Sequence, residues 1–299
     1  MRGSSQDGLM SGLEFVWLEI TPRCNLQCRH CYAGSSPWMK DPGSVDWNRA
    51  IDESYKLGCR KIQFIGGEPT LHPQLGDLIS RARTVGYEFI EVFSNLTAVS
   101  DRLLDKFSSC GVSVATSFYS RDPKIHDSIT GLSGSFNRTV SGIRRVLARG
   151  IPIRVGLILM DVNNQKVDET MRFLADLGIS PEKIKVDEVR PVGRGQSLVQ
   201  CKGQDEALCG ACWQGRLAIT YDGSVYPCVF SRYECLGNAN QDELIDIVSS
   251  EKLKHFRVRI RRMEREREVC GPNCSPDLPP PTTCNPSAGC TPGCNPCSP

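Results

Sequence analysis

The sequence predicts an α/β protein built on a parallel sheet covered by helices, and three observations support that fold class. Six short runs rich in β-branched residues alternate with longer amphipathic stretches between residue 13 and about residue 190. The connections are short, and several helical stretches end at a glycine. Each parallel pairing needs a crossover, which is right-handed, so the alternation indicates one sheet with helices packed on it. Periodicity alone does not distinguish an open sheet from a barrel.

The individual elements follow from the same patterns in chain order. The expected strands are 13–20, 61–65, 88–94, 112–117, 152–159 and 183–189. The expected helices are 45–58, 74–86, 100–109, 137–149 and 166–177. Beyond residue 195 the Asp222-Gly223 pair predicts the turn of a hairpin over 216–228, and a helix with a basic, solvated face is expected over 242–266.

The chain therefore divides into two expected regions. Residues 12–195 form the α/β unit, and residues 196–299 form a small cysteine-rich extension. Its last part, 270–299, is rich in proline and cysteine and has almost no large apolar side chain. Burial cannot fold such a segment, although metal ligation could order it.

Composition excludes several classes of function. The 36 basic and 34 acidic residues nearly balance, so no nucleic-acid partner is expected. Neither a secretion signal nor an apolar run long enough to span a bilayer is present, so a cytoplasmic protein without a membrane partner is expected. Sixteen cysteines in a reducing compartment point to metal or cluster ligation rather than disulfides, while Cys59 and Cys110 stand alone and fit core packing.

Polar and glycine-rich segments follow the first four expected strands. They are 24–31, 66–69, 94–97 and 117–120. The carboxyl ends of parallel strands meet at one edge of the sheet, which is where such folds bind ligands. We therefore expect these four segments to form one site.

The first of these segments holds three cysteines within eight residues. Cys24, Cys28 and Cys31 offer soft thiolate ligands, which favour iron–sulfur clusters, zinc or copper(I). A structural zinc or an ordinary four-iron cluster takes four protein ligands, and no fourth cysteine lies nearby in the sequence. A cluster held by three thiolates leaves one iron open to bind a ligand. A zinc site that borrows a distant ligand, or a redox or structural cysteine cluster, are the alternatives.

Cys24, Cys28, His30 and Cys31, followed by 66-GGEP-69, resemble the C-x3-C-x-aromatic-C and glycine-rich motifs of radical S-adenosylmethionine enzymes. The resemblance covers more than half of the chain and implies a partial (β/α)6 TIM-like barrel. It implies a 4Fe-4S cluster on the three catalytic cysteines and S-adenosylmethionine on its open iron, cleaved to a 5′-deoxyadenosyl radical. The cofactor-binding residues it implies are His30, Gly66, Gly67, Glu68, Pro69, Ser94, Asn95 and Ser117.

Two parts of that inference have specific alternatives. The resemblance implies that Glu68 accepts hydrogen bonds from the methionine ammonium and that Ser94, Asn95 and Ser117 contact the ribose or the carboxylate of the cofactor. Strand-end capping or turn formation is the alternative for these last three residues. The stretch 126–136 also resembles the family, but Thr130 stands where many relatives carry arginine. This departure leaves open which residue recognises the cofactor carboxylate.

The C-terminal cysteines resemble the SPASM or twitch extension, which binds one or two auxiliary 4Fe-4S clusters. The spacing C-x10-G-x4-C begins at Cys212, and C-x5-C-x3-C recurs later, although the expected C-x2-C before it is missing. The auxiliary ligands that the resemblance implies are Cys209, Cys212, Cys228, Cys235, Cys270, Cys274, Cys284, Cys290, Cys294 and Cys297. A zinc ribbon or a disordered tail are the alternatives here.

The extension favours a ribosomally made peptide as the substrate, modified by a cross-link, a thioether or epimerisation. A small molecule of natural-product biosynthesis is the alternative, and an electron-transfer protein without catalysis is a third reading. The family implies an electron donor such as flavodoxin or ferredoxin. Only 23 residues precede Cys24, so a leader peptide is expected to need a separate binding protein or the barrel itself. Cys201 and Tyr119 are candidate hydrogen-atom donors.

Overall fold

The computed structural model describes residues 12–160, 165–200 and 203–269. Within these ranges one nine-stranded sheet runs in the order β6-β5-β4-β3-β2-β1-β7-β8-β9. All pairings from β6 to β7 are parallel. The first six strands in chain order are β1 (Phe15–Glu19), β2 (Lys61–Ile65), β3 (Phe89–Phe93), β4 (Ser113–Phe118), β5 (Ile153–Leu159) and β6 (Ile184–Glu188). The predicted α/β class and all six predicted strands are confirmed.

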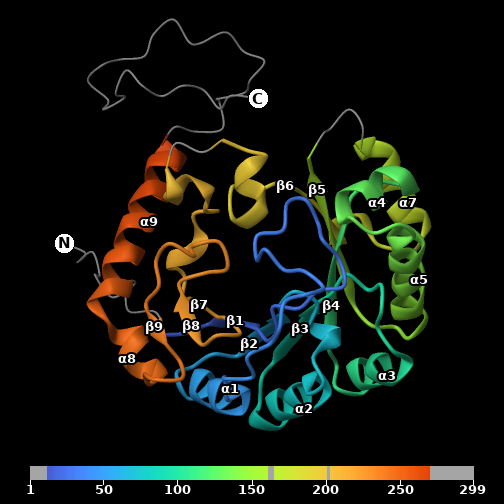
Figure 1. Ribbon diagram of the computed structural model, residues 1–299. Coiled ribbons are helices and arrows are strands. Elements are labelled where there is room, and N and C mark those ends of the chain that lie inside the picture. The colour runs from blue at the N-terminus through green and yellow to red at the C-terminus, as the bar shows by residue number, and fades with distance from the viewer. Residues whose placement is uncertain (1–11, 161–164, 201–202, 270–299) are drawn as a thin grey trace, which may run out of the picture.

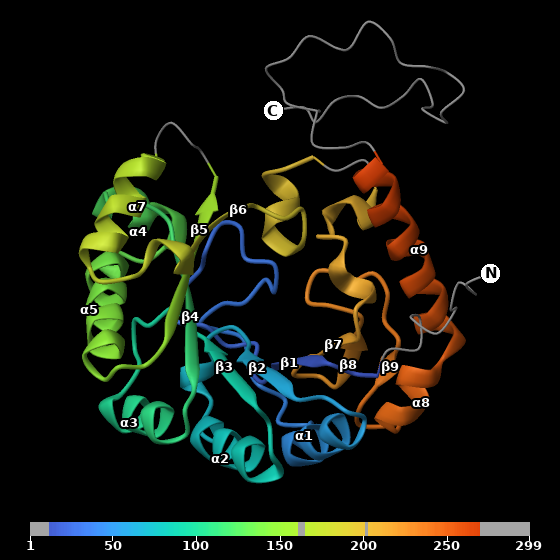
Figure 2. The ribbon, with the colours of Figure 1, turned by 180° about the vertical axis from the view of Figure 1, so that it is seen from behind.

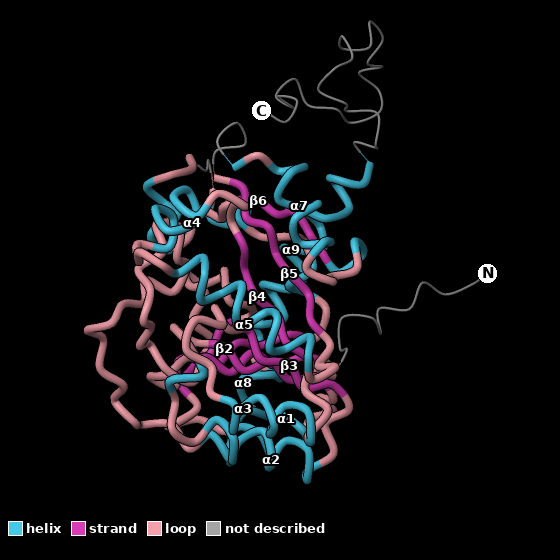
Figure 3. Tube along the Cα trace, turned by 90° about the vertical axis from the view of Figure 1, so that its right-hand side faces the viewer, coloured by secondary structure: helices cyan, strands magenta, loops and turns pink. Residues whose placement is uncertain are grey.

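The sheet bends into an open arch with helices on its outer side (Figures 1 and 2). Figure 3 shows the strands as one layer, with α1, α2 and α3 outside it. The helices of this half are α1 (Trp47–Lys56), α2 (Leu75–Val85), α3 (Asp101–Ser109), α4 (Pro123–Thr130), α5 (Ser135–Ala148) and α7 (Val167–Asp176). Short 3-10 turns are η2 (Pro69–Leu71), η3 (Pro181–Lys183), η4 (Gly193–Ser197), η5 (Gln204–Ala207) and η6 (Ala211–Trp213).

Local sequence signals explain where several helices begin and end. Asp46 and Ser100 each accept a hydrogen bond from a backbone N–H in the first turn of α1 and α3. Gly86 ends α2 in the left-handed conformation, with φ of 115°. Helix α4, which the sequence analysis did not predict, starts at Pro123 behind an Asp122 cap.

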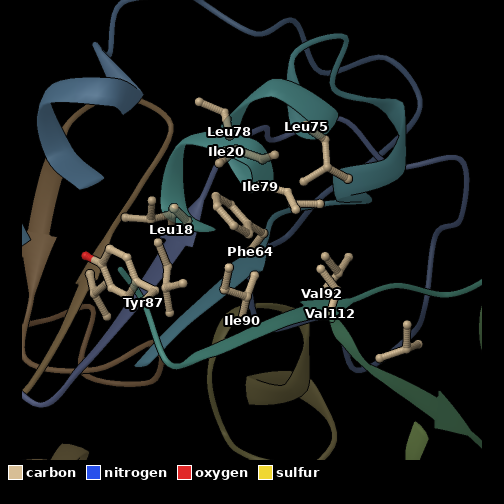
Figure 4. Close-up of a cluster of buried hydrophobic side chains, with 14 of the residues drawn as sticks. Leu18, Ile20, Phe64, Leu75, Leu78, Ile79, Tyr87, Ile90, Val92 and Val112 are labelled. Carbon is tan, nitrogen blue, oxygen red and sulfur yellow. The ribbon is translucent and has the colours of Figure 1, made fainter. Parts of the chain in front are cut away.

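The main core lies between the sheet and the outer helices. Val16 and Leu18 alternate along β1 with less buried residues and are fully buried. Figure 4 shows this packing around Phe64, with side chains from α2 above and neighbouring strands beside it. Cys59 is also buried in this core, and Cys110 packs against it, as predicted. The face of the sheet that points toward the outer helices is therefore occupied by core packing.

The C-terminal part continues the same sheet. Its elements are β7 (Arg216–Ile219), β8 (Ser224–Tyr226), β9 (Gly237–Asn238), α8 (Leu244–Ser249) and α9 (Glu251–Val269). The predicted hairpin is confirmed, because β7 and β8 pair antiparallel across the Asp222-Gly223 turn. Strand β7 also pairs in parallel with β1, so the sheet extends beyond residue 195. The division at that residue stays a prediction.

The predicted single helix over 242–266 is wrong. Ser250 has extended backbone, with φ of −63° and ψ of 143°, and separates α8 from α9. Its hydroxyl accepts a hydrogen bond of 3.3 Å from the N–H of Leu253, so it caps the second helix. In the described part of the chain, no helix combines the length and apolar character that crossing a bilayer requires.

Candidate cofactor site

The three-cysteine segment forms a loop that follows β1 and lies inside the arch (Figures 1 and 2). Cys24 is buried, Cys28 and Cys31 are partly buried, and all three are free thiols. The N–H of Cys31 donates to the carbonyl of Cys28 over 3.2 Å, which forms a tight turn between these two cysteines. The loop thus presents the three thiols from one short, internally bonded segment.

The electrostatics of the loop suit a bound cationic centre. Burial raises the pKa of the Cys28 thiol to about 12, and burial together with Glu68 raises that of Cys24. Cys28 and Cys31 each raise the pKa of the Cys24 thiol further, as expected for thiols placed close together. A coordinated metal deprotonates such thiols and removes this penalty.

The donor set fits an iron–sulfur cluster, because it consists of three free thiols, the soft ligands that such clusters take. His30 adds a second sign of fit: its Nδ1 is buried and has no hydrogen-bond partner in the described structure. Burial lowers the pKa of His30 to about 4, so the ring is neutral at pH 7.

The 66-GGEP-69 segment packs directly against the three-cysteine loop. The N–H of Gly67 donates to the carbonyl of Thr21 over 2.7 Å, and that of Glu68 donates to the carbonyl of Arg23 over 2.8 Å. A Cβ at Gly66 would lie 2.6 Å from the Thr21 oxygen, and one at Gly67 would overlap the Arg23 carbonyl. Both glycines are therefore needed for this backbone approach, and the buried Pro69 starts η2 behind them.

Glu68 is at the centre of a buried hydrogen-bond network and is 1% exposed. Its Oε1 accepts from the Thr70 hydroxyl at 2.6 Å and the Ser94 hydroxyl at 2.7 Å, and its Oε2 accepts from the Asn95 N–H at 2.7 Å. Burial raises the pKa of this carboxyl despite those donors. The structure thus gives Glu68 a role in fixing the ends of β2 and β3. Its predicted contact with the methionine ammonium stays a prediction.

Asn95 joins the end of β3 to the three-cysteine loop. Its amide nitrogen donates to Oδ1 of Asn25 at 2.9 Å and lies 3.8 Å from Sγ of Cys24. Asn25 in turn donates to the hydroxyl of Thr97 at 2.7 Å. Ser94 and Asn95 therefore reach the site. Ser117 is a half-buried residue of β4 opposite Gly156 of β5, and its side chain bonds to the hydroxyl of Tyr119.

Helix α4 holds the other side of the loop through its backbone. The N–H groups of Gln27 and Arg29 donate to the carbonyls of Thr130 and Ile129 over 3.0 and 2.9 Å. The Thr130 hydroxyl lies 2.6 Å from that of Ser135 and is buried. Thr130, which departs from the family pattern, thus contacts the loop through its backbone carbonyl. Its side chain bonds within the turn between α4 and α5.

Three C-terminal cysteines form a second group of thiols. Sγ of Cys212 donates to Sγ of Cys228 across 3.1 Å, and Cys209 bonds to Cys212 as well. The bond from Cys212 lowers the pKa of Cys209 to about 5 and lowers that of Cys228, while the same bonds raise the pKa of Cys212. Cys235 is exposed, and its thiol faces the carbonyl of Gly237 at 3.5 Å.

Several predicted residues lie outside the described ranges. They are the hydrogen-donor candidate Cys201 and the predicted auxiliary ligands Cys270, Cys274, Cys284, Cys290, Cys294 and Cys297. Four further residues support the loop or the turn behind it, and the sequence analysis gave them no role: Asn25, Thr97, Asp127 and Arg194. The first three lie within the segments 24–31, 94–97 and 126–136 that the sequence singled out, whereas Arg194 is remote from all of them in the sequence.

The fold and the three-cysteine loop define an α/β partial barrel with three free thiols on the loop that follows its first strand. The chain belongs to the radical SAM superfamily, whose family model matches residues 18–174. A second family model, an iron-sulfur cluster-binding domain, matches residues 209–275. S-adenosylmethionine and 4Fe-4S clusters are therefore its cofactors, and the partial-barrel prediction is confirmed.

Individual relatives are distant. The antilisterial bacteriocin subtilosin biosynthesis protein AlbA of Bacillus subtilis is 26% identical over 266 residues, which cover 78% of this chain and 58% of that protein. A probable GTP 3′,8-cyclase of Methanopyrus kandleri is 24% identical over 277 residues, which cover 80% and 89%. The crystal structure of Streptococcus suis SuiB bound to precursor peptide SuiA shares the fold with a TM-score of 0.65 at 13% identity, covering 82% of this chain and 66% of that one.

Proposed function

We propose that this chain uses the three-cysteine loop to hold a 4Fe-4S cluster with one iron open to S-adenosylmethionine. The observation that carries the proposal is the loop itself, in which Cys24, Cys28 and Cys31 lie together beside the glycine-rich segment at Gly66 and Gly67. When bound, the cluster supplies the electron that cleaves S-adenosylmethionine and yields a 5′-deoxyadenosyl radical able to abstract hydrogen.

The protein residues position and shield that chemistry. Cys24, Cys28 and Cys31 are the proposed cluster ligands, and the glycines allow the 66–69 backbone to approach the loop. Glu68, Ser94 and Asn95 hold the ends of β2 and β3 in place, because their polar atoms bond to one another below the loop. A buried site of this kind also keeps water away from a reactive intermediate.

Cys209, Cys212 and Cys228 are the proposed protein ligands of an auxiliary cluster. They already lie in hydrogen-bond contact, and two of them have lowered pKa values, which favours the thiolate form that binds iron. Cys235 and the cysteines after residue 269 remain proposed further ligands. An auxiliary cluster can accept an electron from a substrate radical, which allows net oxidation.

The proposed substrate is a ribosomally made peptide. AlbA is named for the biosynthesis of a bacteriocin, and SuiB was crystallised with a precursor peptide. The chain spans 58% of the length of AlbA and 66% of the length of SuiB. The proposed substrate is therefore inferred from similarity to these proteins and not from a substrate site in this structure. A flavodoxin or ferredoxin as electron donor, a separate leader-binding protein and a cytoplasmic location belong to the same proposal.

A small-molecule substrate is the second candidate, favoured by one specific observation. The match to the probable GTP 3′,8-cyclase covers 89% of the length of that protein, whereas the match to AlbA covers 58% of the length of AlbA. A nucleotide or a related small molecule would replace the peptide, while the proposed cofactor chemistry would be the same.

One experiment separates the two substrates. The reconstituted, reduced protein is given S-adenosylmethionine with either short peptides encoded beside its gene or nucleoside triphosphates, and 5′-deoxyadenosine is measured. The peptide proposal predicts that a peptide raises its formation and changes mass only when S-adenosylmethionine is present. Turnover with a nucleotide and no peptide response would replace it with the second candidate.

A further inference from the structure

Arg194, which follows β6, donates hydrogen bonds from its side chain to the backbone of the three-cysteine loop and of the residues after it. Its Nε donates to the carbonyl of Cys28 at 2.9 Å, Nη1 to that of Gly34 at 2.9 Å and Nη2 to that of Ser35 at 2.9 Å. Its own backbone N–H donates to the carbonyl of Cys31 at 3.0 Å. One residue therefore bonds to the backbone of two of the three proposed cluster ligands and to the segment that follows them.

The backbone beside Arg194 is fitted to the same loop. Gly193 has φ of 59°, which disfavours residues with a side chain. A Cβ at Gly193 would lie 2.6 Å from the carbonyl oxygen of Cys31 and would overlap that of Tyr32. The chain after β6 therefore touches the loop backbone directly, which fixes where the Arg194 side chain starts.

The guanidinium suits this position for two reasons. It is planar and forked, so it can bond to several carbonyls at once, and a lysine ammonium on a flexible stem cannot reproduce that geometry. It is also always charged, and a fixed positive charge beside a cluster stabilises the reduced, more negative form.

We propose that Arg194 is a positioning residue for the cluster: its fork fixes the loop that carries Cys28 and Cys31, and its charge favours cluster reduction. This inference rests on the proposed function, because it assumes that the loop binds the S-adenosylmethionine-binding cluster. A purely structural role, in which Arg194 only stabilises the fold, predicts a different outcome.

Arg83 provides a matched control within the same chain. Its Nε donates to the carbonyl of Cys110 at 2.9 Å, Nη1 to that of Tyr87 at 2.9 Å and Nη2 to that of Gly111 at 3.2 Å. Its side chain also donates to three backbone carbonyls, but these belong to the connections that precede β3 and β4, at the amino ends of the strands. Substituting Arg83 therefore removes equivalent bonds without touching the three-cysteine loop.

The test compares R194Q, R194K, R83Q and R83K as full-length, anaerobically reconstituted proteins. The cluster signal in electron paramagnetic resonance that changes on adding S-adenosylmethionine identifies the cluster at the loop. Two quantities are then measured for that signal: its rate of loss in an iron chelator and its reduction potential. Circular dichroism melting reports the overall stability of each variant.

R194Q is expected to lose the signal about tenfold faster and to have a lower potential, since removal of supporting contacts weakens metal binding by about 10- to 100-fold. R194K is expected to lose the cluster nearly as fast but to keep a potential closer to that of the parent, because it retains the charge. Both Arg83 variants are expected to match the parent in both quantities.

Three results would overturn the inference. Parent-like chelation rates and potentials in both Arg194 variants would leave Arg194 a purely structural residue. If R83Q lost the cluster as fast as R194Q, the loss would follow from lower overall stability and not from the contact between Arg194 and the three-cysteine loop. A parent protein whose signal ignores S-adenosylmethionine would remove the proposed function itself, and this inference with it. Should R194Q not fold, R194K decides the question alone through its chelation rate.

Discussion

The phenol oxygen of Tyr119 lies 4.0 Å from Sγ of Cys28 and 3.5 Å from Nε2 of His30. Tyr119 is buried, and burial raises the pKa of its hydroxyl well above the usual value, so the group keeps its proton and can donate to a thiolate. The Tyr119 hydroxyl therefore points at the three-cysteine loop. This geometry favours a role in tuning the cluster over the hydrogen-atom donation that the sequence analysis considered.

Tyr119→Phe should lower the reduction potential of the cluster at the loop. A hydrogen bond to a ligand sulfur stabilises the reduced cluster, and losing a weak one should shift the potential by about 20–60 mV. A redox titration followed by electron paramagnetic resonance measures the shift. Tyr87→Phe is the control, because that hydroxyl donates to the carbonyl of Ile51 at 2.9 Å, remote from the loop. An unchanged potential in Tyr119→Phe, with altered product yield instead, would support the donor role.

Gly67→Ala should displace the three-cysteine loop, because the new Cβ would overlap the carbonyl of Arg23. Overpacking of this kind costs about 1–3 kcal/mol of stability, and the displaced loop should bind S-adenosylmethionine more weakly. Equilibrium dialysis and thermal melting report the two effects. Gly76→Ala is the control, since a Cβ there meets nothing within 4 Å, and it should be neutral or stabilising. Equal effects of the two substitutions would show that the close approach at Gly67 is unimportant.

Asp127→Asn should loosen the turn between α4 and α5. Burial raises the pKa of the Asp127 carboxyl, but donors at Phe136 N–H, the Ser135 hydroxyl and Gly134 N–H outweigh that effect and hold the pKa below its usual value. Because the side chain is partly exposed, its loss should cost only about 1–2 kcal/mol at pH 7.

The pH dependence of that cost follows from the direction of the shift. A lowered folded-state pKa contributes stability above the unfolded value of about 3.9, and that contribution is lost as the pH falls through the folded value. Urea unfolding should therefore show a larger stability difference between the parent and Asp127→Asn at about pH 7 than at about pH 3. Amide exchange at Gln27 and Arg29 should also quicken, because their acceptors belong to α4. A constant difference between the two proteins at both pH values would contradict this account.

Cys212→Ser should remove one auxiliary cluster, which corresponds to about four irons per chain. Cys212 bonds to both Cys209 and Cys228, so it is the centre of the C-terminal thiol group. Cys110→Ser is the control, since that residue lies at the end of α3, and its iron content should match the parent. Iron and sulfide analysis of the reconstituted proteins gives the comparison. An undiminished iron content in Cys212→Ser would end the auxiliary-ligand proposal for these three cysteines.

The strands and most helices could be predicted because their signals are local. Alternating burial, caps such as Ser100 and terminal glycines such as Gly86 act within a few residues. Ser250 was an available but overlooked cap signal inside the predicted long helix. Helix α4 has only eight residues, too few for a clear periodic pattern, although Asp122-Pro123 marks its start.

The site was predictable only in part, for the same reason. The three cysteines and 66-GGEP-69 are contiguous motifs, so their chemistry is visible in the sequence. The contact between Arg194 and Cys28 spans 166 residues and depends on how β6 is placed relative to β1. The parallel pairing of β7 with β1 is also a tertiary choice that no local pattern specifies.

The central claim is that the loop of Cys24, Cys28 and Cys31 holds a cluster with one iron free for S-adenosylmethionine. Its most direct test is the yield of 5′-deoxyadenosine from S-adenosylmethionine after dithionite reduction, measured for the parent and for Cys28→Ala with auxiliary clusters intact. The account predicts formation of 5′-deoxyadenosine by the parent and none above background by the variant. No product from the fully reconstituted parent, or equal product from Cys28→Ala, would contradict it.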